Sequence, residues 1–305
     1  MKAFTALVHR EFIEHRGAFL TGPLIMLGIL FGITILAFTV GRVDVHMSGA
    51  LLTIVPLIIY EIGFFGLGFA WSLYLGVTLF FYCADGFSAD KRNNSMLFWK
   101  SMPVTDFKVL LSKMTAALTI LPGMVFAIAL LSGVLLFGVA FVVMSINGTA
   151  SVGALGAIVG IYGNVALTLF TALIVALLWY LPIMALVGAI AAAIGRWAIP
   201  IALLLPTLVS TLEWVTLGGL HPFATNTWDF LQYRLALPTT AYADNWFVNV
   251  EQADSIGFDI ARFDGVAAAS DLFANLDWTQ IGIGIVFAVA VIYVASEYRR
   301  RVNDN

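Results

Sequence analysis

The residues near the N-terminus that could bind a metal are two histidines and two glutamates. His9, Glu11, Glu14 and His15 fall within the stretch HREFIEH. A zinc site on a single helix uses the pattern HExxH, in which two imidazoles and a catalytic glutamate face one ion. The histidines here do not have that spacing, so the stretch does not predict a zinc hydrolase.

Other catalytic patterns are missing from the sequence. It has no GxSxG nucleophile motif and no convincing pair of aspartates inside an apolar run, so an intramembrane enzyme is a poor alternative. It also has no GxxxxGK[ST] loop, whose backbone amides and lysine hold nucleotide phosphates. Cys83 is the single cysteine, which excludes an intrachain disulfide and a thiol metal cluster. We therefore expect this chain to bind no cofactor of its own and to be no enzyme by itself.

One carboxylate lies well inside an apolar run. Burying a charged Glu61 in a membrane would cost about 2.5 to 3.5 kcal/mol, so it needs a partner, a proton or water. At about 100° per residue, Glu61 shares a helical stripe with Gly68, Ser72 and Gly76, and small residues allow close helix approach. The stripe predicts that Glu61 faces another helix, either as a structural carboxylate or as part of a substrate path. Glu213, beside Trp214 near the end of a later run, is interpreted as a gate or packing residue.

These side chains must be positioned by membrane helices. Of the 305 residues, 61% are apolar and 11% are charged, a balance that no soluble domain could hide from water. A membrane span needs about 20 residues. Apolar runs of sufficient length predict an all-α integral membrane protein, with one domain covering residues 1–305. Its six spans lie near residues 18–40, 51–82, 115–144, 158–194, 198–217 and 278–296.

The positive charges predict the orientation of the spans. Cytoplasmic loops carry an excess of lysine and arginine. With both termini in the cytoplasm, only Arg42, Arg234 and Arg262 lie outside, and the cytoplasmic set is Lys2, Arg10, Arg16, Lys91, Arg92, Lys100, Lys108, Lys113, Arg196, Arg299, Arg300 and Arg301. Residues 219–277 are rich in acidic and aromatic side chains, so we expect an extracytoplasmic segment of short amphipathic helices.

Residues 1–16 precede the first span. Phe4, Leu7, Val8 and Phe12 follow helical spacing, which predicts an interfacial helix lying flat on the membrane. The helix that contains the second span looks longer than a bilayer requires, and the third could begin as early as Asp106.

Residues 83–114 form the largest cytoplasmic loop, which contains SADKRNNSMLFWKSMPVTDFKVLLSKM. A short helix over residues 93–101 would end before Pro103, and Thr105 would cap the next helix, with Asp106 in its first turn. The cations of this loop could anchor helix ends to anionic lipid headgroups, or could surround an apolar knob that docks into a partner. Composition does not separate these two hypotheses.

Two stretches carry a family resemblance. FSADKRNNSMLFWKSMPVTDFKVLLSK resembles the cytoplasmic loop of type 2 ABC exporter permeases, and LWYLPIMALVGAIAAAIGRWAIPIALLLPTLVSTLE resembles their fourth and fifth spans. The chain departs from the pattern at Met102 and Met184, where other apolar residues are expected. The resemblance covers most of the chain and least of the acidic segment.

The resemblance implies a permease subunit of an ABC exporter in the cell (inner) membrane. The loop would hold a coupling helix, with Phe98 and Trp99 as inserted anchors. ATP and Mg would be bound by a separate cytoplasmic ATPase, and a second permease copy or paralogue would complete the path. Membrane lipids are the other expected partner, and nucleic acid is not expected. The implied ATPase contact comprises Asp90, Lys91, Arg92, Asn94, Met96, Leu97, Phe98, Trp99, Lys100 and Ser101.

Two other functions stay open. A stand-alone secondary transporter could use Glu61 for proton coupling, since carboxylates at membrane depth serve in proton relays. A membrane subunit of the same architecture could instead signal to a partner without transporting anything. The sequence does not specify the substrate, nor whether the two permeases are identical.

Overall fold

The computed structural model describes residues 2–41, 51–92, 105–217, 226–236 and 264–304. Within these ranges the regular structure is helical. In chain order the elements are α1 (Lys2–Arg16), a π-helical turn (Gly17–Thr21), α2 (Gly22–Thr39), α3 (Leu51–Arg92), α5 (Asp106–Leu118), α6 (Ile120–Ile146), α7 (Val152–Ile194), a 3₁₀ turn (Gly195–Trp197), α8 (Ala198–Leu217), α9 (Thr227–Leu235), α11 (Gly265–Ala274) and α12 (Trp278–Asp304).

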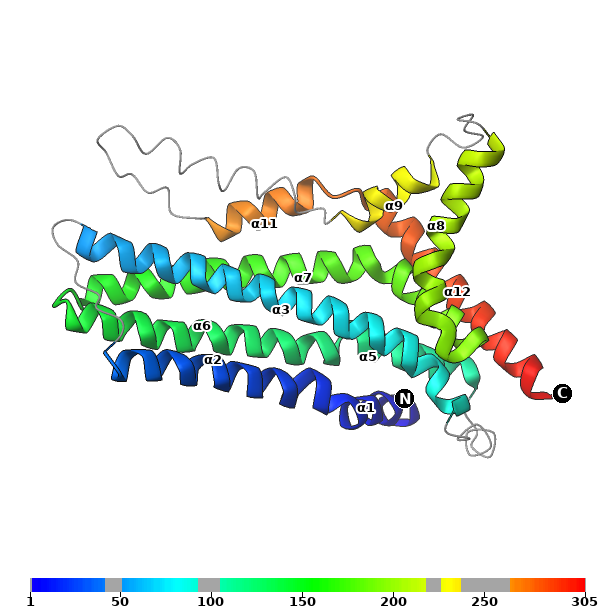
Figure 1. The fold of residues 1–305 in the computed structure, drawn as a ribbon, viewed down its shortest axis with the longest axis horizontal. Helices are drawn as coiled ribbons and strands as arrows, with labels where there is room; N and C mark the ends of the chain where they lie inside the picture. The colour runs from blue at the N-terminus through cyan, green and yellow to red at the C-terminus, as the bar shows by residue number, and fades with distance from the viewer. Residues whose placement is uncertain (1, 42–50, 93–104, 218–225, 237–263, 305) are drawn as a thin grey trace.

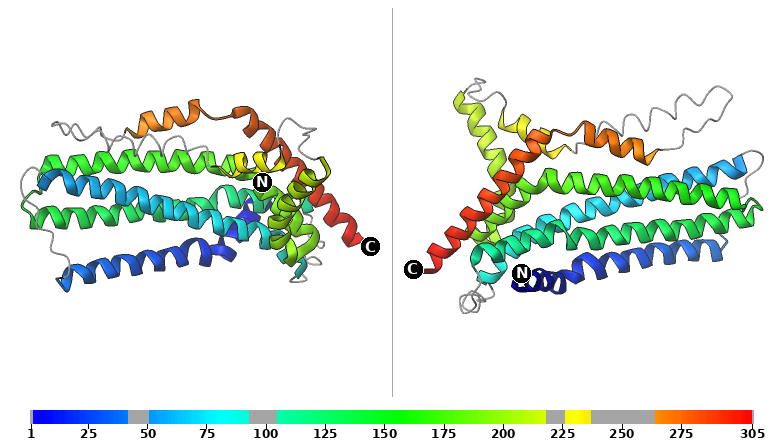
Figure 2. Two further views of the ribbon diagram at one scale, coloured as in Figure 1. Left: turned by 45° about the horizontal axis from the view of Figure 1, so that its top comes forward. Right: turned by 180° about the vertical axis from the view of Figure 1, so that it is seen from behind.

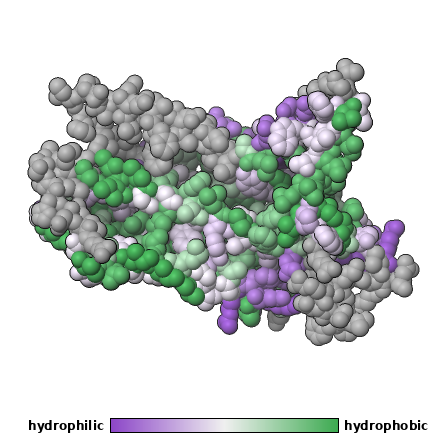
Figure 3. Space-filling model, viewed as in Figure 1, coloured by the Kyte–Doolittle hydropathy of each residue, from purple (hydrophilic) through white to green (hydrophobic). Residues whose placement is uncertain are grey.

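Six helical stretches of the described chain are long and apolar enough to cross a membrane. They are Ala3–Thr39, Val55–Phe87, Asp106–Ile146, Val152–Ile194, Ala198–Thr216 and Trp278–Arg301. Apolar side chains cover much of the visible face of the molecule, and polar ones gather near α1 (Figure 3). The prediction of an all-α, multi-pass membrane protein with six spans agrees with this arrangement.

The helices form a long bundle with two crossing members. α2, α3, α6 and α7 run side by side along the long axis, whereas α8 and α12 cross it at an angle at one end (Figures 1 and 2). α3 lies at the centre and packs against both α6 and α7. A glycine on each neighbour receives a ring from α3: Phe64 lies against Gly133, and Phe87 against Gly188. Because a larger side chain would collide with these rings, the glycines set the close approach of the helices.

α1 turns away from α2 at the π-helical segment Gly17–Thr21. Figure 1 shows α1 nearly end-on while α2 runs along the bundle. Pro23 in the first turn of α2 lacks the amide that would extend a regular helix back into this segment. The predicted helix over residues 1–16 is therefore present as Lys2–Arg16, and its position at a membrane surface stays a prediction.

The predicted third span consists of two helices. α5 begins at Asp106, and the Thr105 hydroxyl accepts a hydrogen bond from the Lys108 amide at 3.4 Å, which confirms the expected cap. The helix breaks at Thr119, because Pro122 three residues later cannot donate to the Leu118 carbonyl and its ring crowds that group. A second helix, α6, then completes the span.

The basic ends of the helices lie together. The end of α3, the start of α5, the turn between α7 and α8, and both ends of the chain lie at the same end of the bundle (Figure 1). This is the end to which the sequence assigns most lysines and arginines. Which side of a membrane it faces stays a prediction.

Two short helices of the acidic segment 219–277 lie within the described residues. α9 packs against α8 and α7, and α11 packs along α7 (Figure 1). A Cβ on Gly265, the first residue of α11, would lie 2.7 Å from the Asn164 Cα, so the two helices touch backbone to backbone. The expectation of short helices is met here, and their extracytoplasmic position stays a prediction.

Candidate functional site

The predicted ATPase contact lies between two described helices. Asp90, Lys91 and Arg92 form the last turn of α3, and α5 begins again at Asp106. The other predicted contact residues lie outside the described residues: Asn94, Met96, Leu97, Phe98, Trp99, Lys100 and Ser101. The structure thus places the two stems of the loop, which are the end of α3 and the start of α5.

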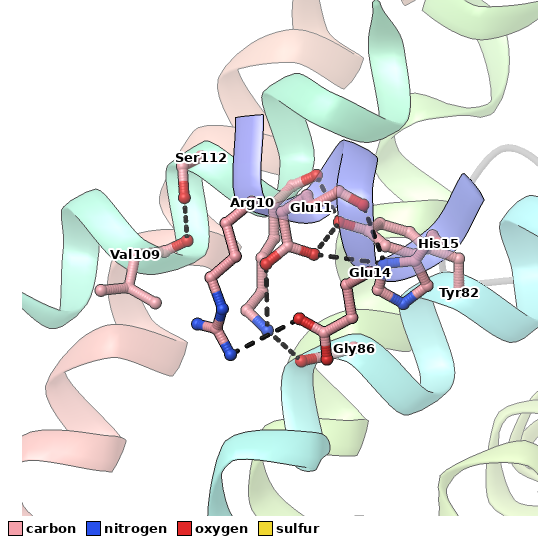
Figure 4. A network of polar contacts seen from close by, with 9 residues as sticks. Arg10, Glu11, Glu14, His15, Tyr82, Gly86, Val109 and Ser112 are labelled. Atoms are coloured by element: carbon pink, nitrogen blue, oxygen red, sulfur yellow. Dashed lines mark hydrogen bonds and ion pairs between the residues drawn. The ribbon is translucent and has the colours of Figure 1, made fainter. Parts of the chain in front are cut away.

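A buried polar network joins these stems to α1 (Figure 4). The Lys113 ammonium on α5 donates to the Gly86 carbonyl on α3 at 2.7 Å and lies 3.6 Å from Glu11 Oε1 on α1. The Tyr82 hydroxyl on α3 donates to Glu11 Oε2 at 2.9 Å. Both oxygens of the Glu11 carboxylate are therefore engaged, one by each loop stem.

Glu11 and Lys113 are 2% and 3% exposed, so this ion pair is shielded from water. Removing one partner of a buried pair leaves an uncompensated charge and typically costs about 3 to 5 kcal/mol. Breaking this pair should consequently cost far more stability than breaking a surface ion pair between α1 and α5.

The remaining polar residues of α1 lie at the edge of the network. The His15 ring packs edge-on against Tyr82 at 4.7 Å between centroids, and its Nδ1 lies 3.7 Å from Glu11 Oε2. Glu14 pairs with Arg10 at 3.4 Å, with about two fifths of each side chain exposed. His9, Glu11, Glu14 and His15 thus do not converge on one point, because Glu11 turns into the bundle and Glu14 turns outward.

Sequence reasoning missed this network, although a signal for it was present. Glu11 continues the apolar stripe of Phe4, Leu7 and Val8 with helical spacing, so it occupies an inward position. Lys113 likewise lies among the buried positions of α5, next to Met114. A carboxylate and an ammonium that both fall on apolar helix faces are candidates for a buried pair.

The Glu61 stripe divides into two halves. Glu61 is half-buried, and among the described residues no hydrogen bond or ion pair joins it to another side chain. Gly68 is buried against α7, where an added Cβ would lie 2.6 Å from Leu169 Cδ2. Ser72 and Gly76 are exposed, and the Ser72 hydroxyl donates to the Gly68 carbonyl of its own helix at 2.9 Å. The predicted small-residue seam therefore brings helices together at Gly68 and not at Gly76.

Glu213 has a local partner. Its Oε2 accepts a hydrogen bond from the Thr227 amide at 2.9 Å, at the first residue of α9. A carboxylate is favourable at a helix N-terminus, where amides lack intrahelical acceptors. This contact fastens the end of α8 to α9 and accounts for a packing role, while a gating role stays a prediction.

Arg234, which the sequence assigns to the extracytoplasmic side, is buried. Arg234 on α9 is 5% exposed, stacks on the Trp179 ring at 4.5 Å, and donates to the carbonyls of Trp179 at 3.3 Å and Gln280 at 3.0 Å. Pro182 disturbs the α7 hydrogen bonds beside Trp179, and Gly284 leaves room on α12 for the guanidinium. Burial lowers the pKa of Arg234, yet an arginine stays charged at any physiological pH. Arg234 therefore clamps α9 onto α7 and α12.

Comparison with known proteins adds no family assignment. No family model matches the sequence, and no curated protein or solved structure gives a significant match to the chain.

Proposed function

We propose that this chain is the permease subunit of an ATP-binding cassette exporter in the cell (inner) membrane. ATP would be hydrolysed by a separate cytoplasmic subunit that docks on the loop 83–114. The observation that carries the proposal is the junction of α1, α3 and α5, whose buried network fixes both stems of that loop. A loop that is rich in cations and aromatic residues and has both stems fixed suits a docking element better than a lipid anchor, which needs only charge.

A second permease copy or paralogue is part of the proposal. In five of the six candidate spans, 22 to 39% of an apolar stretch of 18 residues is buried inside the chain. In the span formed by α8, only 6% of such a stretch is buried. α8 also carries Thr207, Ser210 and Thr211, and small polar residues are common where membrane helices meet. This helix is the one best placed to gain packing from a second subunit.

The loop contact can be tested by co-purification. The double variant Trp99→Ala with Lys100→Ala should insert normally but retain less of the ATPase subunit expressed with it. Truncating a buried aromatic anchor often costs more than about 2 kcal/mol of binding, which corresponds to roughly thirty-fold weaker binding. ATP hydrolysis by the purified complex should fall in parallel.

The matched control is Trp228→Ala, which removes a tryptophan that is 48% exposed on α9, outside both the loop and α8. It should leave co-purification unchanged. Equal recovery of the ATPase with both variants would rule out the loop as the docking element.

Glu61 supports a second candidate, a proton-coupled secondary transporter. This half-buried carboxylate lies inside the span Val55–Phe87, and no described residue pairs with it. An unpaired carboxylate at such a position could exchange a proton. Under that alternative, Glu61→Gln would abolish uptake driven by a proton gradient in vesicles containing this chain alone.

A further inference from the structure

A buried polar contact between distant parts of the described chain holds α1. Glu11 reaches α5 through Lys113 and α3 through Tyr82 (Figure 4). Leu7 and Val8, on the same face of α1, are buried as well. α1 is thus attached to α5 by charge and by packing and to α3 through Tyr82, whereas it joins α2 through the π-helical turn Gly17–Thr21.

The two attachments of α1 are of different kinds. A π-helical turn is a local irregularity of a helix, and such turns often occur at functional positions. A buried ion pair with additional hydrogen bonds has one favoured geometry, because any separation leaves a charge without a partner in an apolar setting. When the loop stems are displaced, α1 should follow them and bend relative to α2.

We propose that the Glu11–Lys113 ion pair makes α1 part of the element that the ATPase moves, so that displacement of the loop is passed on to the N-terminal helix and the start of the first span. This inference rests on the proposed function, because it needs a motor that pushes the loop. Glu11 and Lys113 are positioning residues in this scheme and touch neither nucleotide nor substrate. A purely structural clamp would hold α1 in place without moving it.

Distances between spin labels separate these cases. Cysteines at three exposed positions carry the labels: Ile13→Cys on α1, Lys108→Cys on α5 and Ser145→Cys at the far end of α6. The native Cys83 is fully buried and takes up no label. Distances are measured in the full complex with the co-expressed ATPase, with and without a non-hydrolysable ATP analogue.

We expect the analogue to change the 108–145 and 13–145 distances together and to leave the 13–108 distance unchanged. The neutral double variant Glu11→Gln with Lys113→Met keeps the side-chain sizes and removes both charges of the pair, so it should still fold. In it the 108–145 distance should respond as before, while the 13–145 response is lost. The single variant Lys113→Arg, which keeps a positive charge beside Glu11, should retain the 13–145 response.

Three results would overturn the inference, and the third can be told apart from the first two. If the 13–108 distance changes in the otherwise unaltered chain, or if the neutral double variant responds normally, α1 is not coupled through this pair. If the analogue leaves the 108–145 distance unchanged, no motor moves the loop and the proposed function fails with the inference.

Discussion

At the residue scale, the buried pair of Glu11 and Lys113 has a large expected effect on stability. Lys113→Met leaves the Glu11 carboxylate without its cation, so the free energy of unfolding should fall by about 3 to 5 kcal/mol. The measurement is the apparent melting temperature of the purified protein in detergent. Adding Glu11→Gln should recover most of this loss, since replacing both members of a buried pair is often nearly neutral.

The control for this prediction is the exposed pair on the same helix. Glu14→Gln removes the partner of Arg10, and exposed ion pairs contribute about 0 to 1 kcal/mol. Equal destabilisation by Lys113→Met and Glu14→Gln would show that Glu11 is not buried beside Lys113.

Two glycines on one stripe of α3 give a second residue-scale prediction. Gly68→Leu would force its side chain into Leu169, and overpacking of this kind costs about 1 to 3 kcal/mol. Gly76→Leu is the matched control, because no atom outside its own helix lies within 4 Å of an added Cβ. In thermal unfolding, the melting temperature should fall for Gly68→Leu alone. A lower melting temperature for both variants would mean that the whole stripe is packed against other helices.

At the scale of elements, we expect Arg234 to hold α9 against α7 and α12. Arg234→Met would remove two hydrogen bonds from a charged donor, each worth about 1.5 to 3 kcal/mol. It would also remove the positive charge that stacks on the Trp179 ring. We expect faster protease cleavage next to Thr227–Leu235. Arg300→Met is the control, since Glu297 is the one described residue that pairs with Arg300 and the Arg300 side chain is two thirds exposed. An unchanged cleavage rate in Arg234→Met would show that α9 is held by other contacts.

Most helices of the fold could be predicted, because apolar runs and cap residues are local signals. α8 covers 198–217 as predicted, and Thr105 caps α5 as predicted. The break at Thr119 was not predicted, although Pro122 offered the cause. α3 continues ten residues beyond the predicted end of its span, because polar residues after an apolar run can extend a helix as readily as end it.

The pairing of helices could be predicted far less well. Glu11 and Lys113 meet only because α1 packs against α5, and no periodicity reports a contact between such distant residues. The burial of Arg234 likewise depends on room left by Gly284 and on a helix disturbed by Pro182. The proposed docking residues 94–101 were selected by resemblance, and their role stays a prediction.

At the scale of the whole molecule, the proposed complex is a membrane bundle driven from one end. The loop stems, the chain termini and most of the basic residues of the described helices lie at that end (Figure 1). In the proposed complex, energy enters there from another subunit, since the sequence has no phosphate-binding loop of its own. The proton-coupled alternative would place the energy source at Glu61 inside the bundle instead.

ATP hydrolysis by the purified chain, measured with and without its co-expressed ATPase in lipid vesicles, tests this central claim most directly. We predict no hydrolysis by the chain alone, and hydrolysis by the complex that is lost when the phosphate-binding lysine of the ATPase is replaced. Transport by the chain alone under a proton gradient, with no nucleotide and no second protein present, would contradict the account.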